Sequence, residues 1–234
     1  NMALRNASPS FDHWLGTDKM GRDIFVRILF GARISLAVGC LAAVINLIVG
    51  TIYGGIAGYV GGKVDMIMMR VVDIIYSVPS MLYIVLIMLI FGASVVSIML
   101  GISITCWIDM ARIVRQQVKS LKEQEFTMAA FVLGASSSRI LLKHLLINTM
   151  GQIIVTVTLM VPQAIFTEAW LSFLGVGISA PMASWGTLAQ DARELIMTYP
   201  MQTVYPMIAI CITIFSFNFV GEGLEKALDP KRKR

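Results

Sequence analysis

Charged residues are scarce in this sequence: only 14% of its 234 residues are Asp, Glu, Lys or Arg, whereas 57% are hydrophobic. Soluble proteins carry about 25% charged residues. The apolar residues also form long blocks without any charge, which excludes an ordinary soluble domain and predicts a membrane protein. These blocks cover residues 34–62, 74–108, 145–167, 169–190 and 195–221.

Histidine and cysteine are also rare. His13 and His144 are the two histidines, so a metal motif that needs two histidines, such as HExxH, is absent. Cys40, Cys106 and Cys211 lie far apart and form no CxxC pair. A GxxxxGK[ST] phosphate loop is missing as well, which excludes ATP hydrolysis by that route. We therefore expect no catalytic residue, no metal site and no cofactor in this chain.

The apolar blocks predict membrane-spanning helices, because transmembrane β-strands would show short segments of alternating polarity. A helix crosses the bilayer with about 20 residues. The block at 74–108 would make a helix of about 52 Å, so we expect it to fold back as a hairpin near residues 91–94. The predicted fold is an all-α integral membrane protein, a polytopic bundle of about five helices. The expected crossings are 34–59, 74–91, 96–115, 150–174 and 203–222.

The distribution of Lys and Arg predicts the orientation, because cytoplasmic loops collect positive charge. Thirteen of the nineteen basic residues fall on one side, which we assign to the cytoplasm. The chain then begins outside, and we expect a further span to precede this sequence. The expected parts are an extracytoplasmic or interfacial segment, a transmembrane domain with a cytoplasmic loop and an outer loop, and a cytoplasmic basic tail. Their bounds are 1–33, 34–222 with loops at 116–148 and 175–201, and 223–234.

Two ion pairs are expected in the first segment. Asp18 with Arg22, and Asp23 with Arg27, have the i,i+4 spacing that supports a helix. We therefore predict a short helix in the membrane interface that leads into the first crossing.

The cytoplasmic stretch "EFTMAAFVLGASSSRILLKHLLINTM" interrupts the apolar pattern. Residues 125–133 predict a short helix, on which Ala129 and Ala130 form a smooth patch for another protein. Gly134 permits a turn. The serines at 136–138 offer capping hydroxyls for a second helix that continues from about residue 139 into the next span. The alternative is a plain loop in which the glycine only ends a helix.

This stretch resembles the EAA loop of ABC importer permeases, in the form found in the dipeptide, oligopeptide and nickel group. The matching residues are Glu125, Ala129, Ala130, Gly134, Ala135, Ser136, Ile140, His144, Leu146 and Asn148. Further stretches are similar to the C-type permease subunit of that group, in the same order along the chain: "LGTDKMGRDIFVRILFGARISL", "GYVGGKVDMIMMRVVDIIYSVPSMLY", "EAWLSFLGVGISAPMASWGTLAQDAR" and "FNFVGEGLEKALDPKRKR". The chain departs from the pattern at Met128, at Ile147, where the family has Pro, and at Glu222.

The resemblance implies the fold of a type I ABC importer permease in the bacterial cytoplasmic (inner) membrane. It implies a second homologous permease, two cytoplasmic ATPases that bind ATP and Mg, an extracytoplasmic substrate-binding protein and a peptide substrate. Membrane lipid is a further partner, and nucleic acid is not. The ATPases would be contacted by Glu125, Ala129, Ala130, Gly134, Ser136 and His144. The chain itself would transmit motion and would not be an enzyme.

Polar residues in the spans are candidates for the translocation path, because charge inside a membrane is costly. Glu168 would line the path and meet a peptide amino terminus; alternatively, it fixes the turn toward the outer loop. Asn218 is the second path candidate, with helix-to-helix bonding as the alternative. We expect Asp109 to pair with Arg112, one helical turn away.

The outer loop is longer than an ordinary turn, and long loops are usually functional. Trp185, Asp191 and Arg193 lie in it. We expect the loop to contact the substrate-binding protein or to cap the path, and a purely structural lid is the alternative.

Other cargoes and classes remain open at this stage. Permeases that resemble this one also import nickel, glutathione or glycosides. An ion-coupled secondary transporter would need internal repeats and carboxylates at mid-membrane depth, for which Glu168 alone is thin support. A membrane enzyme would need a nucleophile, a base or a metal cluster, which the sequence does not supply.

Overall fold

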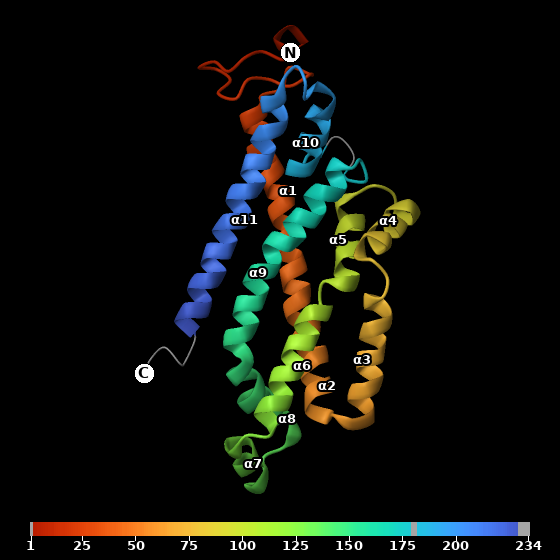
Figure 1. Cartoon of the computed structure of the whole chain (residues 1–234), viewed down its shortest axis with the longest axis vertical. Helices are drawn as coiled ribbons and strands as arrows, with labels where there is room; N and C mark the ends of the chain where they lie inside the picture. Colours follow the sequence, from red (N-terminus) through yellow and green to blue (C-terminus); the bar gives the residue numbers. More distant parts are fainter. Residues whose placement is uncertain (1, 179–181, 229–234) are drawn as a thin grey trace. The chain divides into compact units, whose positions relative to one another are not determined.

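The computed structural model describes residues 2–178 and 182–228 and is built almost entirely of helices (Figure 1). Within these ranges the β-structure is limited to an isolated bridge between Thr17 and Asp23. The elements are η1 (Met2–Leu4), α1 (Ile24–Ile45), η2 (Asn46–Gly50), α2 (Thr51–Val60), α3 (Gly62–Tyr76), α4 (Ser80–Phe91), α5 (Val95–Thr105), α6 (Ile108–Lys122), α7 (Glu125–Val132), α8 (Ser137–Arg139), η3 (Ile140–Leu145), α9 (Leu146–Phe173), α10 (Trp185–Ala192), η4 (Arg193–Leu195) and α11 (Pro200–Leu228). The prediction of an all-α membrane protein is confirmed.

Four helical stretches are long and apolar enough to cross a membrane, and a bent pair, α3 with α4, makes a fifth if it is counted as one span. The four are Ile24–Val60, Val95–Lys122, Ser137–Phe173 and Pro200–Leu228. The first of these stretches begins at Ile24, before the predicted start of the crossing at residue 34. Arg27 is neutralised there by two aspartates, and Arg33 lies 4.8 Å from the centre of the Phe30 ring, so both cations are accommodated within the helix.

The predicted crossing at 74–91 is not one straight helix. α3 ends at Tyr76, α4 starts at Ser80, and the two are bent by 72°. Pro79 lies in the break, where it has no N–H to donate and disfavours helical backbone at Val78. The predicted fold-back near residues 91–94 is present: α4 ends at Phe91, α5 begins at Val95, and Gly101 on α5 lies directly against Ile84 on α4.

The chain divides into two compact units, each built from segments that are distant in the sequence. The first unit contains residues 1–41, 84–101 and 161–217, and the second contains 42–83, 102–160 and 218–234. Each unit is described by itself below.

In the second unit, α2 packs closely on α6 (Figure 1). Gly50, Gly54 and Gly58 are spaced by four residues and face α6. A Cβ on Gly58 would lie 2.7 Å from the carbonyl oxygen of Arg115, and one on Gly54 would overlap the carbonyl oxygen of Ala111. Small residues at this spacing let two backbones approach closely where lipid gives no hydrophobic driving force.

We expect Gly54→Ala to lower the free energy of unfolding by about 1–3 kcal/mol, because the new methyl group forces α2 away from α6. Gly55→Ala is the matched control on the same helix, since its Cβ would meet only side-chain carbons, the nearest at 3.5 Å. Thermal unfolding of the two purified variants in detergent measures the difference. Equal melting temperatures would show that the glycine contact does not hold the two helices together.

A buried apolar cluster joins α6 to the elements that follow it. α6 supplies Met110, Val114 and Val118, which are all 0% exposed. The other members come from α7, η3 and α9, namely Ala130, Ile140, Leu145 and Ile153. This buried cluster of the second unit therefore includes part of the segment singled out in the sequence.

Candidate functional site

Helix α7 is fixed to its own chain along one face. It follows α6 after two residues, and the Thr127 hydroxyl donates a hydrogen bond of 2.8 Å to the carbonyl oxygen of Leu121. Ala130 is buried in the cluster described above. Because these contacts join α7 to α6, a force applied to α7 reaches α6 directly.

The end of α7 exposes a run of large apolar side chains. Phe131, Val132 and Leu133 are 73%, 83% and 86% exposed. Contiguous exposed apolar side chains can mark a contact with another protein or with a membrane, and an apolar helix face can dock into a groove of a partner. These three residues were not predicted as a contact site, although the apolar run "FVL" stands directly before Gly134 in the sequence. We call Phe131–Leu133 the apolar tip.

Gly134 makes the turn that ends α7. Its φ is +79°, and a Cβ there would meet nothing within 4 Å, so this backbone conformation rather than limited space favours glycine. The amide of Ala135 donates to the carbonyl oxygen of Ala130 at 3.1 Å, which closes the helix end. The predicted turn is confirmed.

Two details of the predicted segment are wrong. Ala129 is exposed whereas Ala130 is buried within the chain, so the two do not form one free patch. Ser136 occupies the N-cap position of the next helix, but its side chain makes no capping hydrogen bond. Its carbonyl oxygen instead accepts from the amide of Ile140 at 2.9 Å.

A continuous helical stretch then runs from Ser137 through α8, η3 and α9 to Phe173, as the sequence predicted. Glu125 is exposed at the start of α7, and His144 is half-buried in η3. A groove of about 870 Å³ lies beside α7. Its lining includes Tyr59, Lys122, Thr127, Met128, Phe131 and Leu141. We call residues 125–148 the coupling segment.

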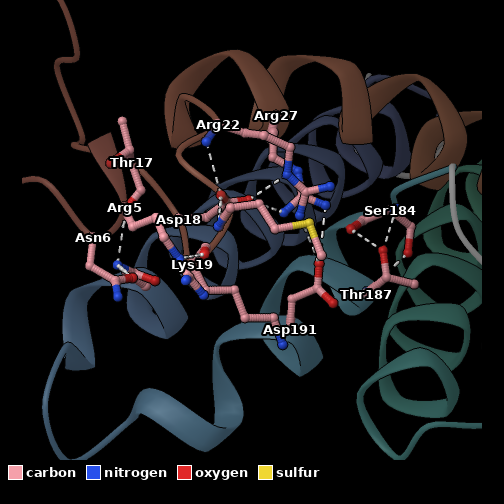
Figure 2. A network of polar contacts seen from close by, with 12 residues as sticks. Arg5, Asn6, Thr17, Asp18, Lys19, Arg22, Arg27, Ser184, Thr187 and Asp191 are labelled. Atoms are coloured by element: carbon pink, nitrogen blue, oxygen red, sulfur yellow. Dashed lines mark hydrogen bonds and ion pairs between the residues drawn. The ribbon is translucent and has the colours of Figure 1, made fainter. Parts of the chain in front are cut away.

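A second polar site, in the first unit, joins the N-terminal residues to α10 (Figure 2). Arg27 donates to Asp18 at 2.8 Å and to Asp191 at 3.1 Å. Arg22 donates to Asp18 at 2.7 Å and lies 3.6 Å from Asp191. Two guanidinium groups therefore share two carboxylates, which we call the arginine clamp.

Further contacts extend the clamp to α11. The Gln202 amide donates to Asn6 Oδ1 at 3.1 Å and to the carbonyl oxygen of Thr17 at 3.0 Å. Lys19 lies 3.9 Å from Glu194. Asn6, Thr17 and Lys19 are thus held against η4 and the start of α11 by polar contacts.

The predicted pairs in this region are half confirmed. Asp18 pairs with Arg22, but in a turn before α1 rather than in a helix. Asp23 pairs with His13 at 2.8 Å, so its expected pairing with Arg27 is wrong. Arg27 is drawn instead to Asp18 and Asp191.

Helix α10 is anchored by Trp185, whose indole N–H donates to the carbonyl oxygen of Ile28 at 3.0 Å. The backbone amide of Trp185 donates to the Ser35 hydroxyl at 3.2 Å. Ser35 in turn donates to Glu168 at 3.1 Å, and Ser172 donates to the other oxygen of Glu168 at 2.8 Å. Glu168 is 0% exposed in this arrangement. Its carboxylate therefore joins α1, α9 and, through Ser35, α10.

Two further site residues were predicted from the sequence, and the structure gives their positions. Asn218 is half-buried on α11, and Arg193 is exposed in η4. Their roles stay predictions. Parts of the predicted outer loop and tail, residues 179–181 and 229–234, lie outside the described residues. Within 2–178 and 182–228, no three His, Cys, Asp or Glu side chains are placed to hold a metal ion.

The arginine clamp depends on ionised Asp18. Burial raises the pKa of Asp18, but hydrogen bonds from Arg22 and from the amide of Met20 outweigh it, so its pKa lies below the ordinary value. A carboxylate with a lowered native pKa stabilises the fold above its unfolded pKa of about 3.9, and this contribution is lost as the pH falls through the native value.

We therefore expect the melting temperature to fall as the pH is lowered below about 4, and to fall less steeply in Asp18→Asn. Asp12→Asn, in the same N-terminal segment, is the control and should follow the wild-type curve. Thermal unfolding across this pH range is the measurement. Identical curves for Asp18→Asn and the wild type would remove Asp18 from the account.

Comparisons with known proteins place this architecture. The family model described as "Binding-protein-dependent transport system inner membrane component" matches residues 50–234. The chain belongs to this family. The oligopeptide transport system permease protein OppC of Bacillus subtilis (strain 168) is 52% identical over 234 residues, which are 100% of this chain and 77% of that protein. The dipeptide transport system permease protein DppC of the same organism is 48% identical over 235 residues, 100% of this chain and 73% of its own length.

Solved structures agree on the fold. An inward-facing structure of the MetNI methionine ABC transporter matches with a TM-score of 0.69 at 16% identity, over 88% of this chain and 96% of the other. An amino acid ABC transporter, in a crystal structure with histidines, matches with a TM-score of 0.67 at 14% identity, over 87% and 94%. This family member is thus a permease with the fold of ABC importers, and it is a membrane protein.

Proposed function

We propose that this permease is the C-type subunit of a bacterial peptide importer, with oligopeptides or dipeptides as its cargo. The proposal is supported by two relatives, 52% and 48% identical over the whole of this chain, whose names give these two cargoes. It would lie in the cytoplasmic membrane as a multi-pass protein. A second permease completes the path, and an extracytoplasmic protein delivers the peptide.

Two cytoplasmic ATPases, which carry the ATP and Mg, drive this permease through its coupling segment. The observation that carries this step is the apolar tip, which is exposed although Thr127 and Ala130 on α7 are buried against the chain. A partner groove that covers Phe131, Val132 and Leu133 would bury them and grip α7. ATP-driven closure of the two ATPases then moves α7, and the spans rock as rigid bodies.

The arginine clamp and α10 are the proposed outer surface for the substrate-binding protein. Arg193 offers an exposed charge at this surface, and Asp191 is half-buried and paired within the arginine clamp. Trp185 is 4% exposed and holds α10 in place rather than touching a partner. The buried position of Glu168 favours its anchoring role over direct contact with substrate in this conformation. Asn218 is the weaker candidate for the path.

The experiment is uptake by proteoliposomes that contain both permeases, both ATPases and the neighbouring binding protein. Labelled tripeptide should accumulate inside when ATP is present on the ATPase side, and unlabelled dipeptides or longer peptides should compete. Nickel, glutathione and a glycoside are tested as competitors in the same assay. Competition by one of these, with none by peptides, would reassign the cargo, and uptake driven by an ion gradient without ATP would refute the ABC mechanism.

A further inference from the structure

A movement of α7 can be transmitted through α6 as well as through α9, because α6 leads directly into α7. Four basic residues lie along α6 at spacings of three or four, which places them along one side of a helix. They are Arg112, Arg115, Lys119 and Lys122. Their partners decide which neighbours follow α6 when it moves.

The strongest of these contacts joins α6 to α3. Arg115 grips Asp65 with two hydrogen bonds, one from Nε to Oδ1 and one of 2.6 Å from Nη2 to Oδ2. Lys119 lies 3.8 Å from the same carboxylate. The Asp65 side chain is only 8% exposed. A forked guanidinium on a buried carboxylate fixes both distance and orientation, which a single surface ion pair does not.

The neighbouring pair on the same two helices is exposed. Arg112 donates to Asp73 at 3.0 Å, with side-chain exposures of 36% and 56%. The guanidinium of Arg112 also lies 4.3 Å from the centre of the Tyr76 ring. The expected pairing of Arg112 with Asp109 is therefore wrong, because α3 supplies the closer carboxylate.

Glycines form the turn between α2 and α3, and beyond it the Tyr53 hydroxyl on α2 donates a hydrogen bond of 2.8 Å to the carbonyl oxygen of Met68 on α3. Two glycines, Gly61 and Gly62, join the helices with φ values of +71° and +57°, and a Cβ on either would meet nothing within 4 Å. α3 has two buried residues, Asp65 and Val72. Val72 packs with Trp107, Ile108 and Ala111 near the start of α6. At the glycine end of α3, the buried attachment to α6 is therefore Asp65.

We propose that Asp65 is a positioning residue for transport: held by Arg115 and Lys119, it makes α3 move with α6 and the coupling segment as one body. This inference rests on the proposed function. α2 follows α6 through the glycine contact, and α3 follows through the carboxylate. Without Asp65, the glycine end of α3 loses its buried attachment to α6, so less of the ATP-driven motion of α7 reaches α3.

The test uses the complete complex of both permeases, both ATPases and the binding protein in proteoliposomes. Asp65→Asn keeps the size of the side chain and removes its charge. We expect it to retain the ATPases but to reduce the peptide imported per ATP hydrolysed by about tenfold, within the range of coupling between sites in other proteins. Asp73→Asn, on the same helix, is the matched control and should keep the wild-type ratio. A wild-type ratio in Asp65→Asn would overturn the proposal.

Two further measurements separate the ion pair from general damage. Exchange of the charges, Asp65→Arg with Arg115→Asp, should restore most of the peptide imported per ATP hydrolysed. Failure to restore it would refute the Asp65–Arg115 ion pair as the connection between α3 and α6. In the wild-type complex, spin labels at the exposed positions Ile67 and Ser137 should keep one distance with and without trapped ATP. A distance that changes with ATP overturns the proposal, even if Asp65→Asn does not assemble.

The failure of the proposed function would look different. If charges placed in the apolar tip leave ATPase recovery intact, the coupling segment is not the ATPase contact. In contrast, the apolar tip can be needed for ATPase recovery while Asp65→Asn keeps the wild-type ratio of peptide imported to ATP hydrolysed. That combination of results would reject only the proposed role of Asp65.

Discussion

Replacing Leu133 with Asp is expected to abolish recovery of the ATPase subunits with the purified permease, while the protein still inserts in the membrane. Leu133 is 86% exposed, so the folded chain loses little packing. In the complex, the new carboxylate would be buried without a partner in an apolar groove. Residues at the centre of such interfaces contribute enough that we expect affinity for the ATPase to fall about 30-fold or more.

The measurement is pull-down of the ATPases from detergent-solubilised membranes, with titration of the purified ATPase for affinity. Met197→Asp is the matched control, because Met197 is 95% exposed and lies in the outer loop between α10 and α11. It should recover the ATPases at the wild-type level. Unchanged binding by Leu133→Asp would contradict the assignment of the apolar tip as the ATPase contact.

Glu168→Leu is the substitution that we expect to destabilise the first unit most. It leaves the buried hydroxyls of Ser35 and Ser172 without their acceptor. An unsatisfied buried polar group costs about 1–3 kcal/mol, so two such groups would cost several kcal/mol and lower the melting temperature markedly. Glu168→Gln retains an acceptor oxygen and should cost much less.

Thermal unfolding in detergent compares the two variants, and uptake of peptides with free and blocked amino termini separates anchoring from the path role. An anchor predicts that Glu168→Gln imports both peptides as the wild type does. A selective loss of uptake for free amino termini, with an unchanged melting temperature, would return Glu168 to the translocation path.

Local features of this protein could be predicted from its sequence. Charge-free blocks gave the spans, because the bilayer demands long apolar helices whatever the tertiary fold. The turn at Gly134 and the helix on each side of it were also predictable, since glycine is the residue that adopts positive φ without strain. The residues of the coupling segment lie together for the same reason: they are neighbours in the sequence.

Long-range pairs were not predictable from spacing. Arg27 and Arg112 each have an aspartate within one helical turn, yet Arg27 binds Asp191 and Arg112 binds Asp73, which are distant in sequence. The i,i+4 rule ranks only local partners, whereas helix packing offers others at better geometry. The burial of Ala130 beside exposed Ala129 was hidden likewise, because it depends on which face of α7 packs on α6.

The central claim is that this permease is moved by separate ATPases through the coupling segment and does not pump by itself. The most direct measurement is vectorial uptake of labelled tripeptide by proteoliposomes with ATP present. The two permeases with the binding protein should give no accumulation, and adding the ATPases should start it. Sustained accumulation by the permeases without any ATPase would contradict the account.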